Sequence, residues 1–313
     1  MKRILFVRDF RPRSNGNIRL SGGHIKIRDY FLHCLAHPQV EPYIYFTPRS
    51  DYENSELWRE IPRDRIVNDP EEVDIDVLFL TDKDLKHLPN RDLAKRKKRI
   101  NLMQTLRACT PDYPVYRYVI KRAYRIFVSP EIYEAGKAFP TDGEPFVIPN
   151  GIPLDNFYPE DKWPNSILIW AKKNPDLGRR IFARLQALNI EAMLLVDYLP
   201  REEFASRLRK TDIFVTCPWV RESFHLPSIE GMASGCAVVT SDNIGNRSFC
   251  IHKETCMMTK YDRDDQYVDA IVTLLQNPEL KQTIQQNAVK KAQYYSLERE
   301  RQDFYRFLER NIL

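Results

Sequence analysis

Two glutamates in the second half of the chain have the spacing and surroundings of a ligand-binding site. Glu222 and Glu230 are separated by seven residues within RESFHLPSIEGMASGCAVVTSD, residues 221–242. Pro227 suits the first turn of a helix, where its missing N–H removes no hydrogen bond, and Gly235 suits a helix end. The pattern predicts a short helix with one carboxylate before it and the other one turn inside it, directly before a buried strand.

The start of this helix is a position at which proteins bind anions. A helix N-terminus carries unpaired N–H groups and the positive end of a dipole, so the loop amides would attract a phosphate or a developing oxyanion. Those amides belong to Ser223, Phe224, His225 and Leu226. Glu230 is able to accept two hydrogen bonds from a sugar diol, and Glu222 would lie beside the reacting part of the same ligand. An arbitrary glutamate pair is more often a solvated loop residue and a helix surface charge.

Short apolar runs that alternate with amphipathic segments indicate a parallel α/β architecture. Strands are predicted at 3–8, 42–47, 76–80, 99–104 and 125–129, and again at 166–171, 192–196, 212–216 and 236–240. Helices are predicted at 24–36, 176–189 and 201–210, followed by three helices from about 264 to 313. The sequence predicts two facing Rossmann-like, doubly wound domains, 1–150 and 151–295, with a cleft between them and ligands beyond the carboxyl ends of the strands.

The stretch around the two glutamates resembles the signature of the retaining family-4 glycosyltransferases, which have the GT-B fold. The resemblance rests on the Glu-x7-Glu spacing, on LPSIEGMASGCAVVTSD, on Gly22-Gly23 after the first strand and on the linker IPNGI. It implies a retaining glycosyltransferase that moves a sugar from a nucleotide-sugar donor to a saccharide or lipid-linked acceptor. It also implies that the C-terminal helix, 296–313, packs back on the first domain.

The resemblance assigns roles to residues in both domains. Glu230 would bind the ribose hydroxyls, Glu222 would lie near the donor sugar, and the amides of 223–226 would hold the sugar or the diphosphate. Lys172 and Lys173 follow the strand at 166–171. They would stabilise the charge that builds on the leaving nucleotide, so neither a cofactor nor a metal is expected.

In the first domain, Gly22 and Gly23 would let the backbone approach the donor phosphate or the acceptor closely. The loop before them carries Arg11 and Arg13, and we expect these side chains to recognise an anionic acceptor or phosphate.

Departures from the family pattern leave a second function open. Ser223 and His225 stand where the family commonly has glycine, and Asn246 and Arg247 stand where an acidic residue often follows a glycine. A catalytically inactive nucleotide-sugar-binding partner subunit is therefore an alternative. His225 is predicted either to contact ligand or to cap and pack the helix.

The net charge of +5 and the isoelectric point near 8.8 favour anionic partners. Basic residues gather in KRKKR at 95–99 and in YPVYRYVIKRAYRIF at 113–127, which suits an amphipathic helix on an acidic bilayer or a solvated helix face. A basic membrane- or nucleic-acid-binding protein is thus a further alternative, although no nucleic-acid-binding module surrounds these residues.

Other patterns were weighed as metal sites and as indicators of compartment. Asp82 and Asp84 follow a strand, but the single-sheet fold in which such a pair binds a metal would not explain the second α/β half. His33 and His37 are four residues apart on a predicted helix, but no third ligand is evident. Six scattered cysteines suggest reduced thiols, and no apolar segment approaches the length of a leader or membrane span. We therefore expect a cytoplasmic protein, with peripheral contact at the inner face of a membrane as an open alternative.

Overall fold

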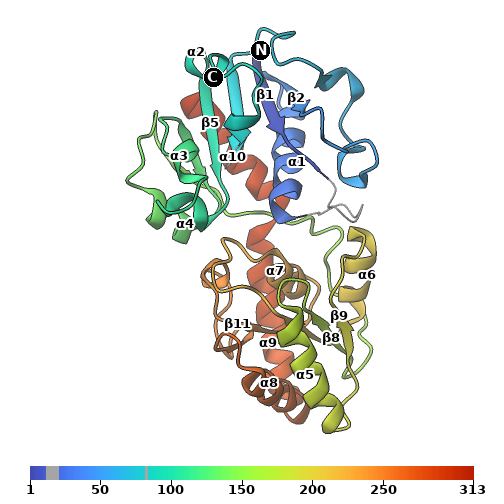
Figure 1. Ribbon diagram of the computed structural model, residues 1–313. Helices are drawn as coiled ribbons and strands as arrows, with labels where there is room; N and C mark the ends of the chain where they lie inside the picture. Colours follow the sequence, from blue (N-terminus) through green and yellow to red (C-terminus); the bar gives the residue numbers. More distant parts are fainter. Residues whose placement is uncertain (12–20, 82–83) are drawn as a thin grey trace. The chain divides into compact units, whose positions relative to one another are not determined.

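The computed structural model describes residues 1–11, 21–81 and 84–313, which form two α/β units (Figure 1). Unit 1 comprises Met1–Pro149 and Glu300–Leu313, and unit 2 comprises Asn150–Arg299. Helix α10 (Leu297–Asn311) begins in unit 2 and belongs to unit 1 from Glu300 onward.

Unit 1 is built on a seven-stranded parallel sheet with the order β3-β2-β1-β4-β5-β6-β7. The strand order reverses between β1 and β4, where ligands bind in doubly wound sheets. The strands are β1 (Lys2–Arg8), β2 (Val40–Phe46), β3 (Ile66–Val67), β4 (Val77–Thr81), β5 (Lys98–Met103), β6 (Tyr124–Phe127) and β7 (Phe146–Val147). The helices are α1 (Gly22–Leu35), α2 (Leu93–Arg96), α3 (Tyr116–Val119) and α4 (Pro130–Gly136), together with α10.

Unit 2 is built on a five-stranded parallel sheet with the order β12-β11-β10-β8-β9. Its strands are β8 (Ile167–Trp170), β9 (Met193–Leu195), β10 (Ile213–Thr216), β11 (Ala237–Ser241) and β12 (Met257–Thr259). Its helices are α5 (Pro175–Ala187), α6 (Arg201–Lys210), α7 (Leu226–Ala233), α8 (Asp264–Gln276) and α9 (Pro278–Ala292). Apolar faces of α5 and α8 cover the sheet in one core, to which Ile181, Val215 and Ile271 contribute fully buried side chains.

The predicted parallel α/β architecture is confirmed, and one helix prediction is wrong. The stretch 113–127 is not an amphipathic helix, because only Tyr116–Val119 is helical and Tyr124–Phe127 forms strand β6. Arg125 of that strand is 1% exposed, and its guanidinium donates to the carbonyls of Lys121 and Pro140. This arginine is therefore a structural residue of unit 1.

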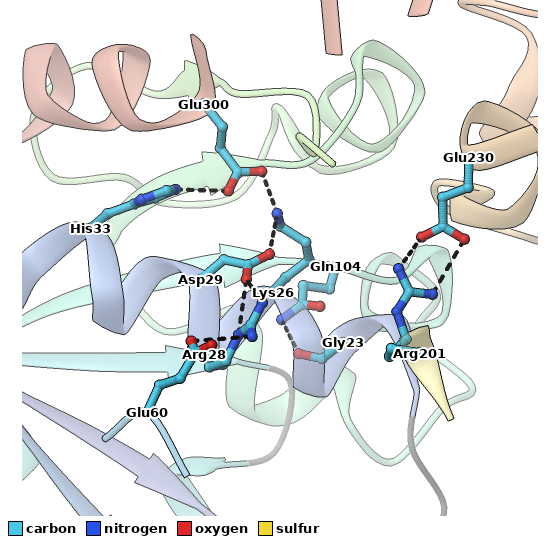
Figure 2. A network of polar contacts seen from close by, with 10 residues as sticks. All are labelled: Gly23, Lys26, Arg28, Asp29, His33, Glu60, Gln104, Arg201, Glu230 and Glu300. Atoms are coloured by element: carbon cyan, nitrogen blue, oxygen red, sulfur yellow. Dashed lines mark hydrogen bonds and ion pairs between the residues drawn. The ribbon is translucent and has the colours of Figure 1, made fainter. Parts of the chain in front are cut away.

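A cluster of buried charges joins α10 to α1 within unit 1 (Figure 2). The Nζ atom of Lys26 lies 2.7 Å from Oδ2 of Asp29 and 2.7 Å from Oε2 of Glu300. His33 Nε2 lies 3.0 Å from the other oxygen of Glu300, and Arg28 contacts Asp29 at 2.7 Å. Burial lowers the pKa of Lys26, but the two carboxylates outweigh this effect, so the pKa is raised and the ammonium stays charged.

Candidate functional site in unit 2

The strand order of unit 2 fixes where a ligand site belongs. Numbered along the unit, the order corresponds to 2-1-3-4-5, so the strand order reverses between β8 and β10. These two strands are paired and in register to their ends, where Thr216 lies opposite Trp170. Ligands of doubly wound sheets bind beyond the carboxyl ends of strands at this reversal. The loop after β8 carries Lys172 and Lys173, and the loop after β10 carries Glu222.

Lys173 and Glu222 form a direct ion pair across these loops. The Glu222 side chain is 10% exposed, whereas the Lys173 side chain is 43% exposed. Glu222 Oε1 also accepts a hydrogen bond from the backbone N–H of Trp219 at 3.4 Å, and the Lys173 ammonium lies 6.0 Å from the centre of the Trp219 ring. The structure thus holds one predicted catalytic carboxylate and one predicted donor-binding lysine against each other.

Lys172 is held differently from its neighbour. Its ammonium lies 4.5 Å from the ring centre of Tyr198, which is 40% exposed. An ammonium over an aromatic face is stabilised by the ring quadrupole. Lys172 and Lys173 therefore present two cations beside the switch point, each next to an exposed aromatic side chain.

The loop before α7 is fastened by its own backbone and by the turn that follows β11. The N–H of His225 donates to the carbonyl of Gly245 at 3.0 Å, and the N–H of Leu226 donates to the carbonyl of Phe224 at 3.2 Å. These two amides of the loop therefore already have backbone acceptors.

Gly245 lies directly beneath this loop. A Cβ atom at Gly245 would lie 2.5 Å from the nitrogen of Phe224 and 2.6 Å from the carbonyl carbon of Ser223. Real Cβ atoms do not approach backbone so closely, so only glycine allows the loop to rest here. Sequence reasoning passed over this residue, although SDNIGNRSF marks it as a turn glycine.

Phe224 and His225 are both buried parts of the loop. The Phe224 ring packs 5.3 Å from Phe249 and 5.8 Å from Tyr295, so it anchors the loop to the unit. His225 is 3% exposed, and its Nδ1 lies 2.7 Å from the hydroxyl oxygen of Ser228. Burial, aided by the charge of Lys173, lowers the pKa of His225 well below its usual value, so the imidazole is neutral.

Glu230 is paired with Arg201, the first residue of α6 (Figure 2). Arg201 Nη2 lies 2.5 Å from Oε1 of Glu230, and Nη1 lies 3.3 Å from Oε2. Glu230 is 1% exposed. Nothing in the sequence distinguished Arg201 from the other charged residues of REEFASRLRK, because its partner lies on another helix.

The turn after β11 shows how the departures from the expected pattern are accommodated. Asn246 is completely buried, and its amide nitrogen donates to the carbonyl of Ser241 at 3.1 Å. Its amide oxygen accepts from the N–H of Asn243 at 3.3 Å. Arg247 pairs with Asp242 at 2.8 Å. Asn246 therefore stabilises the turn that carries Gly245.

Three of the four candidates in unit 1 belong to the described residues. Gly22 and Gly23 open α1, and the carbonyl of Gly23 accepts a hydrogen bond from Gln104 at 3.4 Å. Arg11 pairs with Asp9 at 2.8 Å. Arg13 lies outside the described residues.

The two pairs weighed as metal sites are engaged in other contacts. Asp84 binds Arg8 at 3.0 Å, and Asp82 lies outside the described residues. His33 contacts Glu300, and His37 packs edge-on against the ring of Tyr305. Within the described parts of the chain, no group of three His, Cys, Asp or Glu side chains is arranged to hold a metal. The helices in those same parts are all too short or too polar to cross a bilayer.

Comparison with known proteins supports the fold and extends over the site. Residues 177–291, which include the loop before α7 and Glu230, match the family described as glycosyl transferases group 1. No curated protein matches the sequence.

Three solved structures resemble almost the whole chain. Sucrose-phosphate synthase from Thermosynechococcus elongatus is 15% identical with a TM-score of 0.74, covering 99% of this chain and 98% of its own. HepE of Anabaena in complex with UDP-glucose is 14% identical with a TM-score of 0.75, covering 99% and 100%. A glycosyltransferase from Rickettsia africae is 14% identical with a TM-score of 0.69, covering 98% of both chains. At these identities the likeness establishes the fold, and the predicted GT-B fold is confirmed.

Proposed function

We propose that this chain is a retaining glycosyltransferase that transfers a sugar from a nucleotide-diphosphate sugar to a saccharide or lipid-linked acceptor. The observation that carries the proposal is the meeting of Lys172, Lys173 and Glu222 at the strand-order reversal of unit 2. The family match over 177–291 supports it, and HepE, a protein of the same fold, has been crystallised with UDP and with UDP-glucose.

The proposed chemistry follows from the charges around the strand ends. When the bond between the sugar and the diphosphate breaks, negative charge builds on the leaving phosphate oxygen. Lys172 and Lys173 would stabilise that charge, as would the positive end of the α7 helix dipole. This arrangement lets cationic side chains serve where other transferases use a divalent ion.

Retention of configuration requires the acceptor to attack the face from which the diphosphate leaves. In the proposed mechanism the sugar passes through an oxocarbenium-like state, and the departing phosphate oxygen takes the proton of the acceptor hydroxyl. Glu222 would lie beside the donor sugar, and its ion pair with Lys173 would keep the carboxylate oriented. Glu230 would bind the nucleoside through the ribose hydroxyls.

The first experiment is a thermal-shift screen of nucleoside diphosphates and their sugars. A ligand that binds only the folded protein, at about 100 times its dissociation constant, adds about 2.7 kcal/mol of stability. NMR of the product formed with the stabilising donor would then report whether the anomeric configuration is kept. If every nucleotide leaves the melting temperature unchanged, the proposal is rejected; an inverted product would reject the retaining mechanism alone.

A nucleotide-sugar-binding protein without turnover is the second candidate, and one observation favours it. The side chain of Asn246, at the position of the family's acidic residue, is occupied by the backbone of its own turn. Such a protein would be stabilised by the donor and would neither transfer nor hydrolyse the sugar.

The acceptor side of the proposal rests on unit 1. Lys98, Arg117 and Lys121 are exposed cations on this unit, and two of them lie over tyrosine rings. They would suit an acidic bilayer carrying a lipid-linked acceptor on its cytoplasmic side. Sedimentation with vesicles that contain anionic lipid, compared with neutral vesicles, tests this contact.

A further inference from the structure

The carboxylate proposed to bind ribose is covered in this structure. Glu230 lies one turn inside α7 and is 1% exposed, and both of its oxygens face the guanidinium of Arg201 (Figure 2). A ribose diol needs these same oxygens as acceptors. Each oxygen that the diol would use therefore already accepts one hydrogen bond from Arg201.

Arg201 is the outer member of this pair. Its side chain is 30% exposed, in contrast to the 1% of Glu230. The guanidinium carbon lies 5.1 Å from the ring centre of Phe157 and 5.9 Å from that of Phe204, so aromatic rings as well as the carboxylate hold it in place. Solvent reaches Arg201, and Arg201 separates Glu230 from solvent.

The ion pair between Arg201 and Glu230 opposes ligand binding at Glu230. A two-point contact between guanidinium and carboxylate is among the stronger polar interactions in proteins, and it is stronger still when one partner is buried. Two neutral hydroxyl groups that replace it form weaker bonds to the same oxygens. Nucleoside binding through the acceptor positions that Arg201 holds therefore has to displace Arg201, and part of the binding free energy is lost in doing so.

We propose that Arg201 is a specificity-determining residue that covers the nucleoside-binding carboxylate and competes with the ribose diol for Glu230. The ligand class is a ribonucleoside diphosphate, alone or attached to a sugar. This inference rests on the proposed function, because it takes Glu230 as the ribose-binding group. It predicts that the ribose hydroxyls contribute less binding free energy in the wild-type protein than in a variant whose Glu230 is not paired with Arg201.

The test compares each nucleoside diphosphate that binds with its 2′,3′-dideoxy counterpart by calorimetry. The readout is the dissociation constant of the dideoxy nucleotide divided by that of the ribonucleotide. This ratio isolates the contribution of the diol. Arg201→Gln removes the charge, and Arg201→Lys keeps the charge but loses the two-point contact. Arg207→Gln is the matched control, because Arg207 lies on the same helix and pairs with Glu203.

In Arg201→Gln the ribonucleotide should bind about tenfold more tightly, the change that corresponds to about 1.4 kcal/mol, while the dideoxy analogue is unaffected. Arg201→Lys should fall between this variant and wild type, and it provides a folded comparison if Arg201→Gln is unstable. Arg207→Gln should leave the ratio at its wild-type value.

Two outcomes overturn the inference and are distinguishable. If Arg201→Gln and Arg201→Lys lower the ratio toward one, Arg201 orients Glu230 for the diol instead of competing with it. If no variant discriminates between ribo- and dideoxy-nucleotides although both bind, Glu230 is not the ribose-binding group and nucleotide binding itself stands. If no nucleoside diphosphate binds wild type or any variant, the proposed function fails, and this inference with it.

Discussion

Replacing Lys26 by Met should destabilise unit 1 more than any surface charge substitution. Lys26 is completely buried and touches Asp29 and Glu300, whose exposures are 3% and 0%. Methionine fills a similar volume but supplies no charge, so Asp29 and Glu300 lose the buried ammonium that they share and retain their contacts with Arg28 and His33. Removing one partner of a buried ion pair typically costs about 3–5 kcal/mol, because a charge is left without compensation.

A double-mutant cycle separates this effect from lost packing. Glu300→Leu alone should also lower the free energy of unfolding. The double variant Lys26→Met with Glu300→Leu removes both charges, so its loss of unfolding free energy should be smaller than the sum of the two single losses by about 2 kcal/mol or more. The matched control is Lys137→Met, which removes an exposed pair with Glu134 in the same unit. That substitution should leave the denaturation midpoint nearly unchanged.

Urea denaturation followed by hydrogen exchange suits this protein, because two units need not unfold in one transition. Peptides from α1 and α10 should lose protection in Lys26→Met, and peptides from α5 and α8 should keep it. The reasoning is refuted if Lys26→Met is no more destabilising than Lys137→Met, or if the double-mutant cycle shows no coupling.

Three further outcomes test the site. Gly245→Ala should shift the loop before α7 and lower the free energy of unfolding by on the order of 1–3 kcal/mol, because the added Cβ meets the backbone of Phe224. Calorimetry should also find weaker nucleotide binding. An unchanged loop and an unchanged affinity would contradict the close contact. Lys173→Met should lower kcat of the proposed transfer about 100-fold with little change in donor KM, since it removes a cation that acts on the leaving group. An equal loss on replacing an exposed lysine such as Lys290 would contradict this role. Because the pKa of His225 is lowered in the folded state, the unfolded state binds more protons between that lowered value and about 6.5, so stability should fall as pH drops through this window. Urea titrations at several pH values should show a weaker dependence in His225→Gln, and an identical slope would show that His225 is not the group responsible.

Much of the fold follows from local patterns in the sequence. Buried strands such as Ile213–Thr216 are continuous apolar runs, and helices such as α6 are amphipathic, so their positions are readable. The two- and three-residue strands β3 and β12 carry too short a pattern to be found. The strand predicted at 125–129 corresponds to β6 (Tyr124–Phe127), which pairs with β5, whereas the regularly spaced tyrosines and arginines before it imitate a longer helix than Tyr116–Val119.

The predicted site was readable where it depends on chain order. Lys172, Lys173 and Glu222 follow predicted strands, and the sheet brings those strand ends together. The partner of Glu230 was not readable, because it lies on a different helix. Arg201 on α6 covers Glu230 on α7, and this contact depends on how two helices pack. The sequence contains no pattern that singles out Arg201 or the start of α6.

The shared helix α10 constrains how the protein is made on the ribosome. Unit 1 needs Glu300 as the counter-ion of Lys26, and it needs Phe304, which packs 4.8 Å from Tyr30. These residues are translated only after the whole of Asn150–Arg299, 150 residues that take on the order of 8–30 s at about 5–20 residues per second. During this time the nascent first unit lacks one of the two carboxylates that neutralise Lys26, and it has an uncovered aromatic surface. Synthesis of unit 2 begins after that of unit 1 but ends before it, because the last residues of unit 1 are Glu300–Leu313. Unit 2 is therefore able to finish folding before unit 1 does.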